Sequence, residues 1–179
     1  MPIATLAPFI PNGANLTAML VVICFSAGLN VYATVAMLGL LARAQVLALP
    51  QGLHVVESWT VIGVCCALFL VEFFGDKIPV FDLVWNALLT FVRVHVAGII
   101  TYAATPQLPE GSRLLATLLG AAIALAAHGG KLAARTAATS SPEPFSNAAL
   151  SLGEDGLVVS LTWFMAHHPM AAAAVAAIG

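Results

Sequence analysis

The sequence predicts an all-α fold: a polytopic helical membrane protein with about five to six membrane segments, forming one domain over residues 1–179. Two observations lead to this prediction. First, 61% of the 179 residues are hydrophobic, only 8% are charged, and the mean hydropathy is +1.00. A soluble domain carries about 25% charged residues, so this chain cannot cover a surface that faces water. Second, the apolar residues fall into runs close to the roughly 20 residues that a helix needs to cross a bilayer.

Five apolar runs define the expected segments, and turn residues separate them. The runs are residues 15–42, 58–74, 80–104, 112–130 and 145–166. The breaks carry proline, glycine and polar residues, at 49–52, 76–79, 105–112 and 140–144. A sixth run, 170–178, is too short to span unless it continues the fifth past Pro169. The expected architecture therefore includes helices that are broken or cross only half of the membrane.

The first run carries polar side chains along one face. Ser26, Asn30 and Thr34 lie about one helical turn apart, and Gly28 sits among them. A glycine there either lets a neighbouring backbone approach closely or breaks the helix into halves. Because a broken helix presents N–H and C=O groups to a bound solute, we expect Asn30 to line a solute path.

Two stretches match each other and indicate an internal repeat. Residues 86–93 read NALLTFVR, and residues 147–154 read NAALSLGE. In both, an asparagine, a hydroxyl residue and a charged residue are spaced i, i+4 and i+7, which places them on one helical face. The match predicts repeat A over about 64–104 and repeat B over about 120–166. Chance similarity between alanine-rich helices is the competing explanation.

Charged residues inside the apolar runs have opposite order in the two repeats. Repeat A offers two carboxylates and then a cation, whereas repeat B offers two cations and then two carboxylates: Glu72, Asp76 and Arg93, followed by Lys131, Arg135, Glu154 and Asp155. A charge at the centre of a membrane helix costs roughly 2.5–3.5 kcal/mol on insertion scales, so such groups face protein or water and pair with one another. We expect the first carboxylate pair near the cationic pair. Arg93 should lie near Glu154 or Asp155.

These residues also have plainer interpretations. Lys131 and Arg135 end the fourth run and could anchor it at the interface by snorkelling. Arg93 could do no more than neutralise a buried carboxylate. Ser146 and Asn147 begin a helix whose N-terminal N–H groups could receive an anion, although prolines and serines there are equally typical of a capped turn.

Several classes of function are not expected. The formal net charge is -2 and there is no basic run, so we expect no nucleic-acid partner. His54 with Glu57, and His167 with His168, have no third ligand nearby, so we expect no metal and no cofactor. The sequence contains no nucleophile elbow, phosphate-binding glycine loop or zinc-protease motif, and we do not expect an enzyme.

Three motifs resemble a known family. The stretches SAGLNVYATVAMLGLLAR, LFLVEFFGDKIP and SSPEPFSNAALSLGEDG, between about Ser26 and Pro169, are similar to the bacterial integral-membrane family catalogued as domain of unknown function 4126. The resemblance implies a multi-pass protein of the bacterial inner (cytoplasmic) membrane and implies no substrate. In one departure, residues 94–96 read VHV where we would expect a proline after Arg93, so nothing here predicts a kink in that helix.

These observations favour a small membrane transporter or channel-like protein that moves a polar or anionic solute or an ion through a charged, helix-broken centre. Membrane lipid and a second copy of the chain are the expected partners, and Gly120 with Ala124 forms a small-xxx-small motif for a dimer contact. Two alternatives stay open: a lipid-phosphate handling protein of the flippase or scramblase type, and a non-transporting structural or assembly protein. The residues expected to bind the solute or ion are Asn30, Glu72, Asp76, Arg93, Lys131, Arg135, Ser146, Asn147, Glu154 and Asp155.

Overall fold

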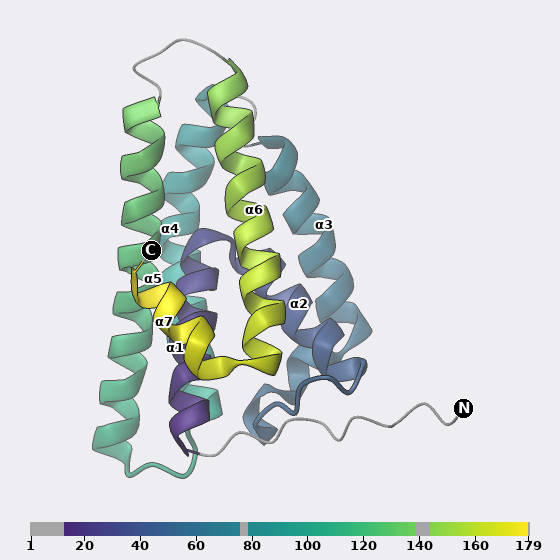
Figure 1. Ribbon diagram of the computed structural model, residues 1–179, viewed down its shortest axis with the longest axis vertical. Helices are drawn as coiled ribbons and strands as arrows, with labels where there is room; N and C mark the ends of the chain where they lie inside the picture. Colours follow the sequence, from purple (N-terminus) through teal and green to yellow (C-terminus); the bar gives the residue numbers. More distant parts are fainter. Residues whose placement is uncertain (1–12, 76–78, 139–143, 179) are drawn as a thin grey trace.

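The structure, a computed structural model, describes residues 13–75, 79–138 and 144–178 (Figure 1). These residues form seven α-helices and one 3-10 helix and contain no strand, so the all-α prediction is confirmed. In chain order the elements are α1 (Gly13–Leu29), α2 (Val31–Arg43), η1 (Gln51–Glu57), α3 (Trp59–Gly75), α4 (Pro79–Ala104), α5 (Glu110–Ala138), α6 (Pro144–His167) and α7 (Pro169–Ile178).

The described helices include two that are long and apolar enough to cross a membrane. These candidate spans are Trp85–Ala104 within α4 and Glu110–Thr136 within α5. A third candidate arises if η1 and α3, which meet at a bend of 63°, form one broken span. The chain is therefore a helical membrane protein with two to three candidate spans, and the larger number of five to six stays a prediction.

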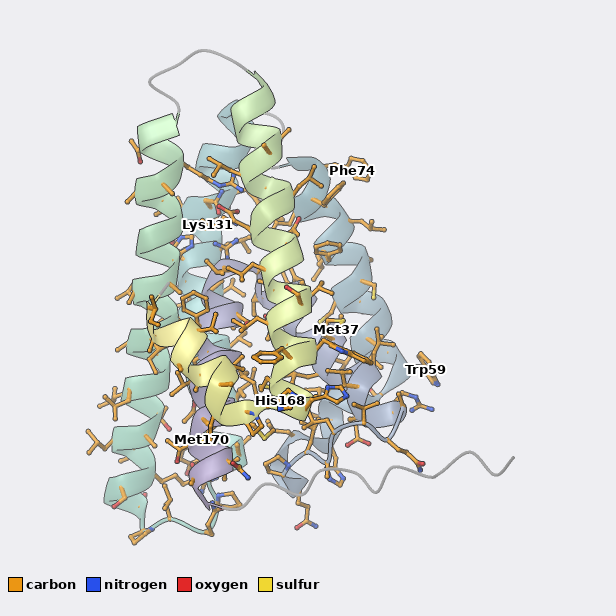
Figure 2. All side chains as sticks on the ribbon, in the orientation of Figure 1. Met37, Trp59, Phe74, Lys131, His168 and Met170 are labelled. Atoms are coloured by element: carbon orange, nitrogen blue, oxygen red, sulfur yellow. The ribbon has the colours of Figure 1, made fainter. Side chains whose placement is uncertain are left out.

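The outer surface of the helices is apolar, unlike that of a soluble protein. Phe74 on α3, Phe91 on α4, Leu118 on α5 and Trp163 on α6 are each more than half exposed. By contrast, Lys131 is buried, and Figure 2 shows it between the helices while Phe74 lies on the outside. An apolar exterior around charged interior groups is the arrangement that lipid requires.

Helices α1 and α2 form a hairpin that enters the helix bundle and turns back at Asn30. Leu16, near the start of α1, and residues 48–51, after α2, line the same pocket, so both ends of the hairpin lie at one end of the molecule. Figure 1 shows its apex near the middle of the long helices. The 13-residue α2 is about 20 Å long, shorter than the roughly 30 Å hydrocarbon core. Residues 15–42 therefore do not form one crossing helix, and the break expected near Gly28 is present.

Asn30 causes this break through its backbone and its side chain. Its φ of -150° and ψ of 101° are extended, and its side-chain oxygen accepts a hydrogen bond from the backbone N–H of Ala33. Asparagine is among the preferred residues at a helix N-terminus because it makes this capping bond. The Asn30 N–H meanwhile closes the last turn of α1 by donating to the carbonyl of Ser26 at 2.8 Å. One residue thus ends one helix and begins the next.

Small residues bring α5 into close contact with α1 and α4. A Cβ added to Gly28 would lie 2.4 Å from the carbonyl oxygen of Ala124, and one added to Gly120 would lie 2.3 Å from Oγ1 of Thr101. Gly120 and Ala124 therefore pack inside the chain. The expectation that this motif makes a dimer contact is wrong, because its small faces are already covered by the chain's own α4 and α1.

Helices α5 and α7 differ from the segments that the sequence predicts. Helix α5 continues to Ala138, past the expected end at 130, because the alanine-rich stretch after it favours a helix. Lys131 therefore lies within the helix, and Arg135 lies in its last turn. Helix α7 begins at Pro169, turns back from α6 (Figure 1) and buries Ala172 and Ala176 in the core. The sixth run therefore does not prolong the fifth.

The arrangement of the long helices bears on the expected repeat. In Figure 1, α3 and α5 run toward the same end of the molecule, and α4 and α6 run back. A duplication of the parallel kind would place α3–α4 and α5–α6 in this way. The duplication itself stays a prediction.

The contact between Gly28 and α5 leads to a stability prediction. We expect Gly28→Ala to lower the free energy of unfolding by about 1–3 kcal/mol, because the added Cβ forces two backbones apart. Gly129→Ala is the matched control: no atom lies within 4 Å of its added Cβ, and alanine in a helix is favoured by about 0.5–1 kcal/mol over glycine. Thermal unfolding of the two purified variants in detergent measures the difference. Equal melting temperatures would refute the close contact.

Candidate functional site

Six charged side chains from four helices converge beside the apex of the hairpin. They are three anions and three cations: Glu72 on α3, Arg93 on α4, Lys131 and Arg135 on α5, and Glu154 and Asp155 on α6. Five of these residues are at most 8% exposed, and the Glu154 side chain is 13% exposed. Within the part of the chain that the structure describes, the set thus holds equal numbers of anions and cations, and solvent scarcely reaches them. We call this set the charged cluster.

Glu72 and Arg93 form the most deeply buried ion pair of the charged cluster. Both side chains are fully buried, and Nη2 of Arg93 donates to Oε1 of Glu72. Nη1 of the same guanidinium donates to the side-chain oxygen of Asn86, 3.3 Å away and seven residues earlier on α4. Asn86 and Arg93 therefore share one face of α4, as their spacing predicts.

His128 on α5 is held in one protonation state by its neighbours. Arg93 can only donate, so the hydrogen bond between its Nη1 and Nδ1 of His128 makes that nitrogen an acceptor. The hydroxyl of Thr90 donates to the carbonyl of Asn86 at 2.9 Å. It therefore accepts the proton on Nε2 of His128, 2.7 Å away. The ring is therefore neutral. It links Arg93 to the hydroxyl of Thr90, which in turn binds the backbone carbonyl of Asn86.

Lys131 connects the two halves of the charged cluster to the end of α1. Its Nζ lies 3.7 Å from Oε1 of Glu72 and 3.0 Å from Oε2 of Glu154. It also donates to the carbonyl oxygen of Leu29 at 3.1 Å. That carbonyl belongs to the last residue of α1, where helix carbonyls lack intrahelical partners and the helix dipole is negative.

Glu154 and Asp155 point to different partners, as expected for adjacent helical residues. Arg135 holds Glu154 with two hydrogen bonds, Nη2 to Oε2 at 2.7 Å and Nε to Oε1 at 3.3 Å. Asp155 instead accepts from Nδ2 of Asn30 at 2.9 Å. The amide of Asn30 thus caps α2 with its oxygen and binds α6 with its nitrogen.

The structure brings most of the sequence-predicted residues together and corrects one pairing. The expected proximity of Glu72 to Lys131 is present. The expectation that Arg93 pairs with Glu154 or Asp155 is wrong: among the described residues its ion pair is with Glu72. The acid on the adjacent helix α3 reaches the guanidinium first, and Lys131 and Arg135 neutralise Glu154.

Three predicted residues are not tested by these contacts. Asp76 lies outside the described residues. Ser146 and Asn147 lie on the first turn of α6, but their side chains are outside the described part of the chain. The carbonyl of Leu29 and the side chain of His128 were not among the predicted site residues. His128 could have been identified from the sequence, since it shares one helical face with Lys131 and Arg135 at i, i+3 and i+7 spacing.

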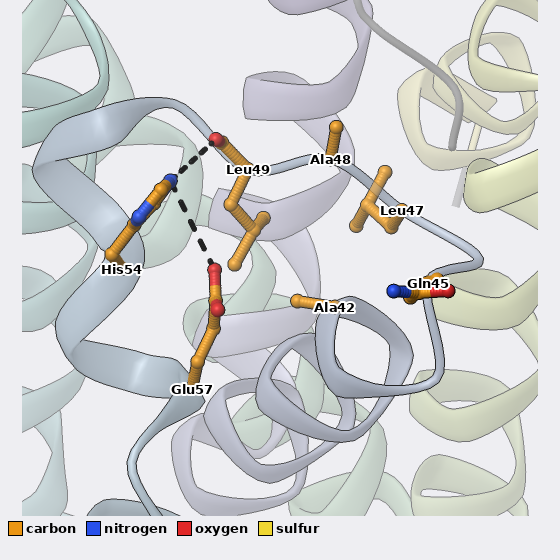
Figure 3. Close-up of a pocket in the computed structure, with 7 residues that line it drawn as sticks. All are labelled: Ala42, Gln45, Leu47, Ala48, Leu49, His54 and Glu57. Atoms are coloured by element: carbon orange, nitrogen blue, oxygen red, sulfur yellow. Dashed lines mark hydrogen bonds and ion pairs between the residues drawn. The ribbon is translucent and has the colours of Figure 1, made fainter. Parts of the chain in front are cut away.

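A surface pocket of about 200 Å³ lies away from the charged cluster, where the end of α2 meets η1 (Figure 3). Nε2 of His54 lies 3.3 Å from the carbonyl of Leu49 and 4.0 Å from Oε1 of Glu57. Among the described residues, no group of three or more His, Cys, Asp or Glu side chains could hold a metal ion. This pocket therefore offers no chemistry comparable to that of the charged cluster.

Comparison with known proteins identifies a family. The family model described as "Domain of unknown function (DUF4126)" matches residues 17–179, nearly the whole chain. No curated protein and no solved structure matches the chain.

The Glu72–Arg93 pair leads to a second stability prediction. We expect Arg93→Met to cost about 3–5 kcal/mol of unfolding free energy, because it leaves a buried carboxylate without its closest cation. The double variant Glu72→Leu/Arg93→Met should recover most of that loss, since it removes both charges. Unfolding in detergent measures all three proteins. Arg43→Met, at an exposed arginine that contacts Trp59 and the carbonyl of Glu57, is the control and should cost at most about 1 kcal/mol. A double variant as unstable as Arg93→Met would contradict the pairing.

Proposed function

The chain belongs to this family of unknown function, and we propose that it is a small transporter that moves a polar or anionic solute or an ion across the membrane through the charged cluster. One observation carries the proposal: among the described residues, five buried charged side chains and the slightly exposed Glu154 meet at the apex of a broken, half-length helix pair. Ionisable groups inside a membrane protein are costly and mark solute or ion pathways. Broken helices at mid-membrane form the binding sites of many transporters.

Unpartnered polar atoms around the charged cluster support solute binding. Nε of Arg93 and the hydroxyls of Ser26 and Ser151 are buried and have no hydrogen-bond partner among the described residues. Leaving such a group unsatisfied costs about 1–3 kcal/mol, so natural proteins keep few of them. A polar solute that reached the charged cluster would find these groups ready to bind it.

The contacts of Glu154 support a mechanism in which a proton enters with the solute. Glu154 is the most exposed member of the charged cluster, and it neutralises both Lys131 and Arg135. Protonation of Glu154 would release these two cations to an anionic solute. In the compact arrangement described here, Glu154 occupies both of these cations.

The remaining parts of the proposal concern the setting of the protein. We infer that it is not an enzyme, that it resides in a bacterial inner (cytoplasmic) membrane, and that its working form is a homo-oligomer. Because Gly120 and Ala124 are used inside the chain, an oligomer would use the apolar outer faces of the long helices. Cross-linking in membranes tests this part alone.

One specific observation favours a second candidate, a structural protein in which the charges only hold the helices together. The pairing of the charged cluster is extensive, and its exposure is close to zero. Handling of a lipid phosphate is less well supported, because Lys131 and Arg135 point inward and bind Glu154 instead of facing lipid.

Transport by the charged cluster leads to a flux prediction. Proteoliposomes that contain the pH dye pyranine receive inorganic phosphate, sulfate or glycine outside, and the internal pH is recorded. We expect at least one of these solutes to acidify the interior through the wild-type protein. Glu154→Gln should reduce this signal to that of protein-free vesicles, because the coupling carboxylate is gone. Glu57→Gln, at the 32% exposed carboxylate of η1, is the matched control and should retain the signal.

The same assay separates transport from a structural role. The double variant Glu72→Leu/Arg93→Met should fold but lose flux if the charged cluster is the solute path. Flux that survives in this variant would refute the path. A wild-type protein that acidifies no vesicle with any of the three solutes would refute proton-coupled transport of a small anion or zwitterion.

A further inference from the structure

The ammonium group of Lys131 sits in a cage of oxygen atoms supplied by other helices. The described oxygens are the carbonyl of Leu29 at 3.1 Å, Oε2 of Glu154 at 3.0 Å and Oε1 of Glu72 at 3.7 Å. They come from α1, α6 and α3, whereas Lys131 itself is on α5. The cage is buried, since the Lys131 side chain is 1% exposed.

The break at Asn30 makes the carbonyl of Leu29 available to this cage. In a continuous helix the N–H of Ala33 would donate to Leu29. Here that N–H donates to the side-chain oxygen of Asn30 at 3.0 Å instead. The carbonyl at the negative end of the α1 dipole is therefore directed to a cation. A backbone carbonyl and carboxylate oxygens together are ligands that hard metal cations prefer.

We propose that this cage is a binding site for a monovalent metal cation and that the Lys131 ammonium is its resident, covalently attached occupant. The charge of the ammonium sets the valence. Lys131 contributes one positive charge between Glu72 and Glu154. One monovalent ion in its place leaves the charge of the site unchanged. Ammonium and potassium ions have similar radii, so K⁺ is the first probe.

This inference deepens the proposed function, because it names the Lys131 ammonium as the cation that a coupling step must displace. Its role in transport rests on the proposed function. When the Lys131 ammonium leaves the cage, a free cation can take its place between Glu72 and Glu154. The cage itself depends only on the contacts given above. Its test is therefore a binding measurement without flux, so its failure and the failure of transport are distinguishable.

The experiment compares two substitutions of Lys131 in the purified full chain. Lys131→Ala leaves the three oxygens and an open space, whereas Lys131→Met fills that space without a charge. Thermal unfolding is followed in KCl, NaCl and choline chloride at equal ionic strength. We expect KCl or NaCl to raise the melting temperature of Lys131→Ala by about 2–4 °C over choline chloride, with saturation. The wild type and Lys131→Met should show no such difference.

Further variants and outcomes decide the proposal. Adding Glu154→Gln to Lys131→Ala should abolish the stabilisation by KCl or NaCl, because the substitution removes the negative charge of the Glu154 carboxylate from the cage. Lys131→Ala that folds only in KCl or NaCl would support the site in a stronger form. Lys131→Ala that melts at the same temperature in all three salts, or that fails to fold in all of them, would overturn the proposal.

Discussion

A charge buried in a membrane protein must have a partner, and this constraint accounts for the arrangement of the helices. Glu72 on α3 is shared between Arg93 on α4 and Lys131 on α5, and Glu154 on α6 is shared between Lys131 and Arg135. Any other order of the helices would separate a buried ion from its counter-ion, at a cost of several kcal/mol. Buried ion pairs add little net stability, so we interpret these as selecting one arrangement among many apolar packings. Apolar side chains alone could not do so, since lipid is as apolar as they are.

The hairpin of α1 and α2 has a place in this bundle because its backbone ends are neutralised by the same charges. A helix that ends at mid-membrane exposes polar backbone groups that water cannot reach. Lys131 satisfies the carbonyl of Leu29, and Asn30 satisfies the N–H of Ala33 and binds Asp155. Gly28 lets the hairpin press against α5 close enough for these bonds to form. The charged cluster and the helix break therefore depend on each other, and neither would be stable in lipid without the other.

The sequence alone predicts the helices more accurately than their arrangement. The ends of α3, α4 and α6 fall within one residue of the expected runs, because turn residues and prolines interrupt the apolar sequence there. The reversal of direction at Asn30 could not be read from composition, since a straight, a kinked and a folded-back helix share the same hydrophobic pattern. Most members of the charged cluster follow from the rule that mid-membrane charges converge. This rule does not predict the partner of Arg93, because α3 and α6 both carry carboxylates and only the packing of the helices decides between them.

The uneven exposure of the two shared carboxylates defines the order in which the charged cluster can respond. Glu72 is fully buried, while Glu154 keeps 13% of its side chain exposed. In the proposed transport, a proton or solute would therefore meet Glu154 first. Lys131 also contacts Glu72 and the carbonyl of Leu29, so loss of the Glu154 charge would affect α3 and the apex of the hairpin through one ammonium group. Lys131 is thus the group through which an event at the exposed side of the charged cluster reaches the helix break.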